Sequence, residues 1–329
     1  MWDSFIFAAK AVAPIFVLMV VGYCLKRIGF AGADFVKVAN RLVFRVFLPA
    51  SLFLNVYRIQ AIGDIDLTYV GYALAVIVGV FLIGIPAVIL LTRHRERRGP
   101  CLQATFRSNF ALVGLPLAES LFGDSGLIIA SLLSAAVIPL YNVLAVISLS
   151  LFSADGKKPS PKKILLDIVK NPLIISIAAG LVALLIRSLL VQNDISWRLT
   201  NLSPLYTVLQ YLASVATPLA LLVLGMQFEF SAVKELRREI LFGTLSRLVA
   251  VPIIGIGVAF LFFRDTFNGA HFAAFVALFA TPVAVSSVPM TQEMRGDTAL
   301  AGQFVVFTTL FSALSIFLAS FLLRLAGVL

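Results

Sequence analysis

The chain has 329 residues, of which 60% are hydrophobic and 13% are charged, with a formal net charge of +10. An average soluble domain has about 25% charged residues, so this composition excludes a soluble globular domain and a disordered chain. Two cysteines, Cys24 and Cys101, are too few for a disulfide framework. The composition predicts an all-α polytopic membrane protein.

Ten apolar runs are long enough to cross a bilayer as helices. They cover residues 4–25, 38–57, 68–91, 101–121, 126–152, 172–191, 203–228, 239–263, 271–293 and 299–323. The second, fourth and ninth runs are the least apolar. We expect these three to line a wet space or to pack inside the bundle.

Most lysines and arginines fall in alternate loops between the runs. These loops hold Lys26, Arg27, Lys37, Arg93, Arg95, Arg97, Arg98, Lys157, Lys158, Lys162, Lys163, Lys170, Lys234, Arg237, Arg238 and Arg295. By the positive-inside rule these loops are cytoplasmic and both termini lie outside. The positive charge therefore reflects topology, and we expect a lipid bilayer and no nucleic acid as the surroundings.

An internal repeat relates the two halves of the chain. A shift of 173 residues pairs identical residues: Ala104 with Ala277, Phe106 with Phe279, Ala111 with Ala284, Pro116 with Pro289, Gly123 with Gly296, Asp124 with Asp297 and Leu127 with Leu300. Five spans per half is an odd number, so the halves must be inverted, as in many secondary transporters. The predicted organisation is a first repeat over 1–152, a cytoplasmic linker over 153–170 and a second repeat over 171–329.

The repeat draws attention to the fourth and ninth spans, where polar and small residues surround Pro116 and Pro289. Proline removes a backbone donor from a helix, and a broken helix survives in lipid only beside protein or a wet cavity. We expect both spans to break at these prolines and to offer half-helix ends to an anion. Two simply kinked packing helices are the alternative.

At these residues the chain resembles the auxin efflux carrier family in its bacterial form. The matching stretches are 106–109 with 114–117, 280–282 with 286–287, 48–50, 171–173, 218–220 and 225–226. The resemblance implies a fold like the sodium–bile acid symporters, with a scaffold of spans one, two, six and seven and a transport domain of the rest. Spans four and nine would cross at their breaks and hold the substrate. It also implies a homodimer in the bacterial inner membrane.

The candidate substrate-binding residues lie in or near the two breaks. They are Arg107, Asn109, Gly114, Pro116, Asn142, Thr281, Pro282, Ser286, Ser287 and Pro289. Asn109 is expected to cap a half-helix or bind substrate, with an interhelical hydrogen bond as the alternative. Asn142 follows Pro139 and has either a kink-repair or a site role. Arg107 either attracts a carboxylate or braces the transport domain.

Three further charged residues are candidates for coupling or charge pairing. Arg45 lies near the middle of the second span, where a charge needs a partner or a cavity. Glu119 and Glu293 lie just beyond the aligned prolines, as proton carriers or halves of ion pairs. Arg247 lies inside the eighth span near its cytoplasmic end, without an assigned role.

These features together predict a secondary transporter for a small organic anion, with a carboxylate as the expected substrate, working by elevator-type alternating access. A sodium-coupled symporter of the bile-acid type is the nearest alternative, with Glu119, Gln292 and Glu293 as available ligands. A passive channel would need a continuous polar lining, which the apolar spans lack. No catalytic constellation, phosphate loop or metal spacing is visible, so we expect neither an enzyme nor a cofactor beyond coupling protons or sodium.

Overall fold

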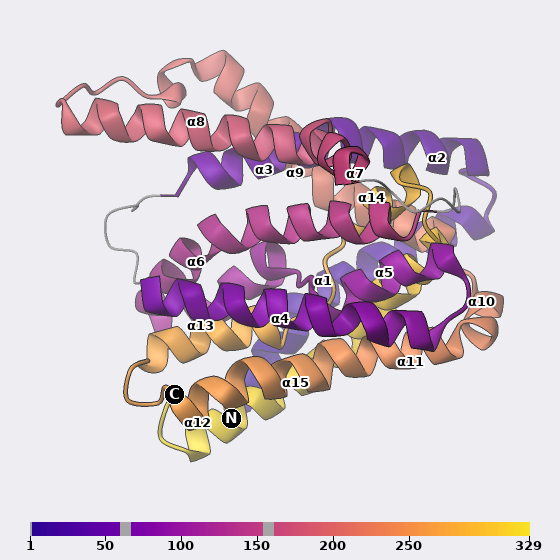
Figure 1. Cartoon of the computed structure of the whole chain (residues 1–329). Coiled ribbons are helices and arrows are strands. Elements are labelled where there is room, and N and C mark those ends of the chain that lie inside the picture. The colour runs from indigo at the N-terminus through magenta and orange to yellow at the C-terminus, as the bar shows by residue number, and fades with distance from the viewer. Residues whose placement is uncertain (1, 60–66, 154–160) are drawn as a thin grey trace.

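A computed structural model describes residues 2–59, 67–153 and 161–329, with side chains described from residue 13 onward. All regular elements in this part of the chain are helical, and they run largely side by side (Figure 1). Their bounds are α1 Trp2–Arg27, α2 Ala33–Leu42, α3 Leu48–Tyr57, α4 Leu67–Leu91, α5 Arg95–Phe106, α6 Leu115–Leu151, α7 Pro161–Val169, α8 Pro172–Gln192, α9 Ser203–Gln227, α10 Phe230–Glu235, α11 Arg237–Leu245, α12 Val258–Phe262, α13 Gly269–Phe279, α14 Ser287–Glu293 and α15 Thr298–Leu325.

Short π-helical and 3₁₀ turns join several of these helices. The π turns are η1 Val43–Phe47, η2 Phe110–Gly114, η4 Ser246–Ala250 and η5 Ile253–Gly257, and the 3₁₀ turn is η3 Leu199–Asn201. Two of them connect α11 to α12 and one connects α2 to α3, so each of those segments is nearly continuous. π turns inside helices often mark functional positions.

Helix covers most of each of the ten predicted runs. Among the described residues, six helical segments are long and apolar enough to cross a membrane: Leu67–Leu91, Phe110–Leu151, Pro172–Gln192, Ser203–Gln227, Arg237–Phe262 and Thr298–Leu325. The second and ninth runs differ from these six in composition or in continuity. The α2–α3 segment carries Lys37, Arg41 and Arg45, and the ninth run is divided into α13 and α14.

The fourth and fifth predicted runs join in one helical segment, α6. Between them Phe122 has φ −143° and Gly123 has φ +61°, so the chain turns there. A left-handed φ is favourable for glycine and costly for most other residues. The predicted linker also contains helix, because α7 occupies 161–169; residues 154–160 lie outside the described part.

The helices pack in two groups. α1 packs against α9, and α3 packs against both α8 and α9, while α13 packs against α6 and α4 against α5; α1 also packs against α15 and so joins the two groups. Figure 1 shows α2, α3, α8 and α9 along one edge of the molecule, with α4, α5, α6, α11 and α13 beyond them. α13 is buried on all sides, with Phe272, Phe275 and Phe279 in the main core. A helix that is apolar all round belongs in such an interior.

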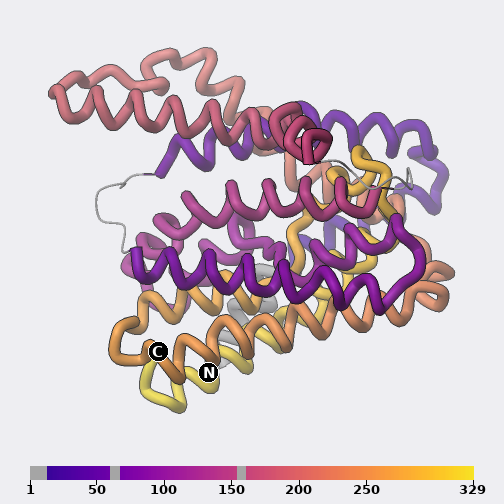
Figure 2. The backbone as a smooth tube through the Cα atoms, viewed as in Figure 1, coloured from indigo at the N-terminus to yellow at the C-terminus, as the bar shows by residue number. Residues whose placement is uncertain are grey.

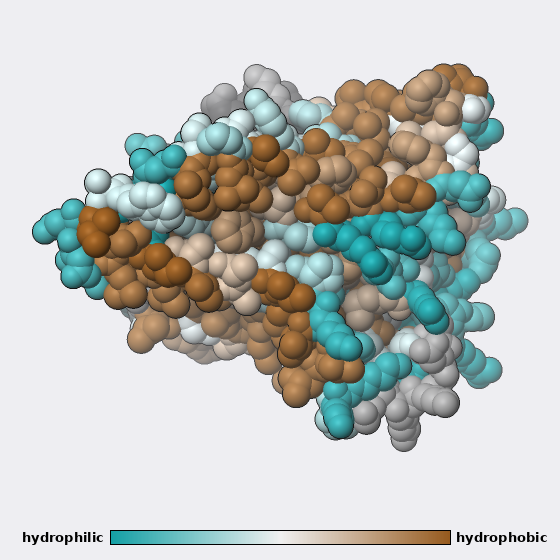
Figure 3. Space-filling view, turned by 90° about the horizontal axis from the view of Figure 1, so that it is seen from above, coloured by the Kyte–Doolittle hydropathy of each residue, from teal (hydrophilic) through white to brown (hydrophobic). Residues whose placement is uncertain are grey.

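The outer surface is an apolar band between two polar ends. In the view of Figure 3, hydrophobic residues cover the middle of the molecule and hydrophilic residues gather at its two ends. Large aliphatic side chains such as Leu185 and Ile186 of α8 are exposed on this band. An apolar belt of this kind is typical of a protein that spans a bilayer.

Candidate functional site

Two helices are interrupted near the middle of the molecule, and the interruptions lie side by side. α5 ends at Phe106, residues 107–109 are not helical and η2 begins at Phe110; α13 ends at Phe279, and α14 begins at Ser287. Ser108 and Val283 form an antiparallel bridge. The Asn109 N–H donates to the Pro282 carbonyl over 2.8 Å, and the Ala284 N–H donates to the Arg107 carbonyl over 3.3 Å. We call residues 107–109 and 280–286 the paired interruptions.

The paired interruptions bring four helix ends together. The C-terminal ends of α5 and α13 carry partial negative charge, and the N-terminal ends of η2 and α14 carry partial positive charge. Figure 2 shows the backbone between α13 and α14 running extended through the middle of the molecule. Thr308 of α15 holds this stretch, because its hydroxyl accepts from the Val283 N–H over 3.0 Å.

Arg247 of η4 binds both C-terminal ends. Its guanidinium is fully buried and donates to the carbonyls of Thr281 at 2.9 Å, Leu278 at 2.6 Å, Phe279 at 3.1 Å and Phe106 at 3.2 Å. The last carbonyls of a helix have no partner within the helix, so they need a donor from elsewhere. Arg247 supplies that donor to α5 and α13 at once and offsets the negative ends of both helices.

Arg107 lies within the first interruption, and its guanidinium is buried among neutral groups. It donates to Gln103 Oε1 at 2.8 Å, Met290 Sδ at 3.1 Å, Asn142 Oδ1 at 3.0 Å and Ser286 Oγ at 3.1 Å. Within the described residues it forms no ion pair with a carboxylate. A buried charge without a counter-ion is costly in a membrane protein and marks a functional site by default.

These contacts link Arg107 and Asn142, two of the candidate residues, to neighbouring helices. Arg107 braces α6 and α14 through Asn142 and Ser286. Asn142 also donates from Nδ2 to the Ile138 carbonyl over 2.9 Å, within the turn that contains Pro139. Asn142 therefore combines a hydrogen bond to its own kinked helix with one to Arg107.

Some buried polar atoms beside the interruptions have no hydrogen-bond partner. They include Asn109 Nδ2 and Ser287 Oγ. Asn109 occupies the N-cap position of η2, but its side chain makes no capping hydrogen bond. Buried polar groups in proteins are nearly always paired, so an unpaired set at one place needs an explanation such as a bound ligand or water.

Gly114 and Thr281 fit the tight packing of this region. A Cβ on Gly114 would lie 2.8 Å from the Ala277 carbonyl oxygen and 2.5 Å from Phe110 Cδ2, so only glycine lets η2 approach α13 so closely. Thr281 is fully buried, and its hydroxyl donates to the Ala277 carbonyl over 2.8 Å.

The prediction that the helices break at Pro116 and Pro289 is wrong in position. Both interruptions come earlier, at 107–109 and 280–286, while Pro116 lies in the first turn of α6 and Pro289 lies within α14. Proline is well tolerated in the first turn of a helix, because its missing N–H is unpaired there anyway. Pro282, in contrast, lies inside the second interruption, and its carbonyl accepts from Asn109.

The charged candidates lie away from the paired interruptions. Arg45 of η1 pairs with Glu293 of α14, with Arg45 Nε 2.9 Å from Glu293 Oε1. Glu293 is thus one half of an ion pair, which is one of the two roles that its sequence position suggested. Gln292 accepts from Asn40 over 2.5 Å and from Gln227 over 3.1 Å. Glu119 is exposed. Gln292 and Glu293 of α14 thus contact α2, η1 and the last residue of α9.

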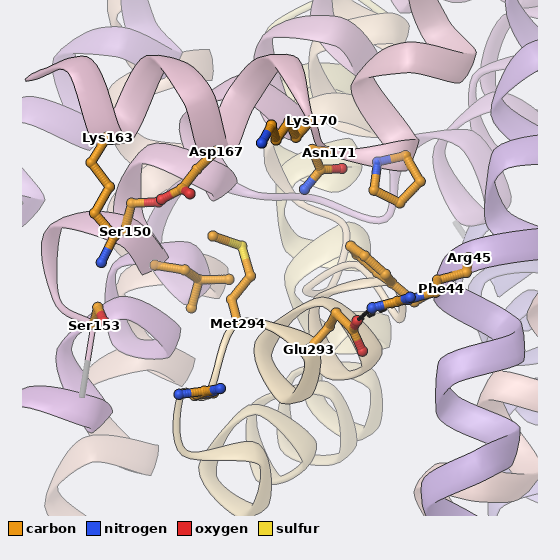
Figure 4. Close-up of a pocket in the computed structure, with 13 residues that line it drawn as sticks. Phe44, Arg45, Ser150, Ser153, Lys163, Asp167, Lys170, Asn171, Glu293 and Met294 are labelled. Atoms are coloured by element: carbon orange, nitrogen blue, oxygen red, sulfur yellow. Dashed lines mark hydrogen bonds and ion pairs between the residues drawn. The ribbon is translucent and has the colours of Figure 1, made fainter. Parts of the chain in front are cut away.

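A cavity of about 620 Å³ lies between the two helix groups, and Figure 4 shows its lining. Basic side chains outnumber acidic ones there: Arg45, Lys163, Lys170 and Arg295 against Asp167 and Glu293. Met294 lies in the same lining, four residues after Met290, which contacts Arg107. The cavity therefore approaches the paired interruptions along α14.

The roles of Arg247 and of Gln103 are not predicted from the sequence. The available signal for Arg247 was a basic residue inside an otherwise apolar run, which the cost of a charge in lipid makes significant. Its partners could not be named, because they lie 31 to 141 residues away along the chain.

Comparison with known proteins agrees with the resemblance. Residues 7–320 match the family model described as membrane transport protein. An uncharacterized transporter of Methanothermobacter thermautotrophicus is 24% identical over 95% of this chain and 97% of its own length. The uncharacterized transporter YfdV of Escherichia coli is 26% identical over 84% of each chain. With a family match over most of its length and several long apolar helices, the chain is a multi-pass membrane protein that belongs to the membrane transport protein family, the auxin efflux carriers.

Proposed function

We propose that the protein is a secondary transporter for a small organic anion, and that the anion is a carboxylate. The observation that carries this proposal is the buried guanidinium of Arg107. It lies in an interrupted helix, and its hydrogen bonds go to neutral groups. An anion bound beside it would supply the missing negative charge.

The helix ends support an anion for the same reason. The N-terminal ends of η2 and α14 carry about half a positive unit each. Arg247 offsets the opposing C-terminal ends of α5 and α13 through its four carbonyl contacts. The balance of charge at the paired interruptions is therefore positive. Asn109 Nδ2 and Ser287 Oγ are unpaired polar atoms available for a ligand.

The architecture we propose has ten transmembrane spans in two inverted five-helix repeats, whose fourth and ninth spans cross at the paired interruptions. The repeat shift of 173 residues supports it, because this shift relates 107–109 to 280–282. The basic loops face the cytoplasm and both termini face outward in this scheme. We also propose a homodimer in the bacterial inner membrane.

The mechanism we propose is elevator-type alternating access. α1, α2, α3, α8 and α9 form the scaffold, and the remaining spans form a transport domain that carries the site. The mutual packing of α1, α3, α8 and α9 supports this division, as does the cavity between the two groups. The positively charged side chains that line the cavity would raise the local concentration of an anion that arrives from the cytoplasm.

Uptake and counterflow in liposomes test the proposal. Purified protein is reconstituted and offered a panel of radiolabelled mono- and dicarboxylates, under separate proton and sodium gradients. We expect saturable counterflow of at least one carboxylate, together with stimulation by one of the two gradients. Leakage of anions and neutral solutes alike would indicate a channel, and transport of amines in preference to carboxylates would contradict an anion site.

A further inference from the structure

The short helix α7 presents a strongly apolar side to its surroundings. Leu165 is 61% exposed, Leu166 is 49% exposed and Val169 is 60% exposed. Their spacing of i, i+1 and i+4 places them on one side of the helix. The other side is attached to the protein, because Ile168 packs on the core and Asp167 accepts from the Ser150 hydroxyl of α6 over 2.9 Å.

α7 also runs across the direction of its neighbours. Figure 1 views α7 nearly along its axis, while α6 and α8 extend across the picture. The chain turns at once into α8, whose N-cap Asn171 accepts from the Leu173 N–H over 2.9 Å. α8 is one of the segments long and apolar enough to span a membrane, so α7 runs across one end of a candidate membrane span.

Three lysines accompany this apolar side. Lys162 and Lys163 lie in the first turn of α7, and Lys170 follows its last residue. Figure 4 shows Lys163 and Lys170 directed into the space beside α7, at the rim of the cavity. A lysine ammonium is a compact charge that suits a phosphate group. Apolar residues on one side and lysines beside them are typical of a helix in the bilayer interface.

We propose that α7 lies in the headgroup–acyl boundary of one leaflet and binds anionic phospholipid. Leu165, Leu166 and Val169 enter the acyl region, and Lys162, Lys163 and Lys170 bind lipid phosphates. Lysines close to a membrane surface are drawn to anionic lipid, and each adds to the binding. Because α7 borders the cavity between the two helix groups, the bound lipid forms part of the rim of that cavity. This inference goes beyond transport and does not depend on the identity of the substrate.

Depth in the bilayer is the first measurement. In the full chain, Cys24→Ser and Cys101→Ala remove the native thiols, and a fluorophore is attached at Leu166→Cys. The matched control carries the label at Asn193→Cys, in the exposed polar turn after α8. In phosphatidylcholine vesicles with brominated acyl chains, we expect the Leu166 label to be quenched at least threefold more strongly than the control. Equal quenching at the two positions would overturn the proposal.

Retention of anionic lipid is the second measurement. Native mass spectrometry counts phosphatidylglycerol retained from mixed phosphatidylcholine–phosphatidylglycerol vesicles. We expect Lys162→Gln, Lys163→Gln and Lys170→Gln together to lower retention at least threefold. The control triple Lys234→Gln, Arg237→Gln and Arg238→Gln removes the same charge elsewhere and should retain lipid like the native protein.

The two measurements separate the outcomes. A quenched Leu166 label with equal lipid retention in both triple variants would overturn the binding of lipid phosphates. If the native protein transported no carboxylate while the α7 triple variant still lost lipid retention, the proposed function would be contradicted and the α7 proposal would stand.

Discussion

Arg45 and Glu293 form an ion pair that joins η1 to α14, two elements that are 248 residues apart in the chain. The pair bridges the two helix groups at the edge of the cavity. It is partly open to its surroundings, because the side chain of Arg45 is 60% exposed and that of Glu293 is 24% exposed. An exposed pair contributes about 0.2–1 kcal/mol, which is enough to bias two conformations without fixing either one.

We therefore predict that Arg45→Gln and Glu293→Gln each change the transport rate while lowering the melting temperature by little. The double variant should resemble the singles, because the pair acts as a unit. Initial rates of counterflow and a thermal melt measure the two effects. Lys26→Gln is the control, because Lys26 of α1 pairs with Glu229, which lies just after α9, and α1 and α9 pack together. Additive effects of Arg45→Gln and Glu293→Gln on the rate would contradict a linked pair.

The charge of Arg107 gives the second prediction. Arg107→Gln should weaken binding of the transported anion more than tenfold, about 1.4 kcal/mol or more. Isothermal titration with the carboxylate found by counterflow measures the affinity. Arg187→Gln is a matched control, since Arg187 donates to the carbonyls of Tyr57 and Ile59 far from the interruptions. Unchanged affinity in the Arg107 variant, with the protein intact, would remove this guanidinium from the site.

Arg247 gives the third prediction, which concerns stability first. Arg247→Met leaves four buried carbonyls without their donor, and a buried acceptor that loses its partner costs about 1–3 kcal/mol. We expect a large fall in the melting temperature. Size-exclusion chromatography of solubilised protein after heating measures it. The melting temperature of Arg247→Lys should fall less, because lysine keeps the positive charge and some of the hydrogen-bond donors. Arg264→Gln is the control, because Arg264 is exposed and donates to the Ala326 carbonyl, and this variant should melt at the same temperature as the native protein. If Arg247→Met also melted at the native temperature, the anchoring role of Arg247 would be contradicted.

Glycine packing gives the fourth prediction. Gly114→Ala places a Cβ within 2.8 Å of the Ala277 carbonyl oxygen, so η2 must move away from α13. We expect lost transport and a lower melting temperature. Gly79→Ala in α4 is the control, because a Cβ there meets nothing within 4 Å. Alanine in a helix interior is about 0.5–1 kcal/mol more favourable than glycine, so this control should be neutral or slightly stabilised. Equal behaviour of the two variants would show that the close approach is dispensable.

The helices could be predicted from the sequence, because long apolar runs in lipid must satisfy their own backbone groups. The two interrupted spans were also predicted, from the aligned prolines. Their breaks were misplaced, since the actual interruptions at 107–109 and 280–286 are completed by hydrogen bonds between segments far apart in the chain. The sequence around position 116 shows a proline, but it does not show that the Asn109 N–H will donate to the carbonyl of Pro282, which is far away in the chain.

The partners of the buried and mid-span charged residues could not be predicted from local sequence either. The cost of a charge in lipid identifies Arg45 as a residue that needs a partner, and the family-like stretch 106–109 singles out Arg107. These observations could not choose Glu293 for Arg45, or Asn142 and Ser286 for Arg107, because those choices depend on how the helices pack. Arg247 had the same signal, and its four carbonyl partners became visible only with the fold.

The antiparallel bridge between Ser108 and Val283 has a consequence for how the chain can be divided. Each interruption supplies the hydrogen-bond partner that the other one requires, through the Asn109 N–H and the Ala284 N–H. Either half alone would carry unsatisfied peptide groups into an apolar interior, at several kcal/mol for each group. A protein made of one half would have to borrow the complementary segment from a second molecule. Two fragments cut within 154–160 should therefore recover the fold only when they are produced together.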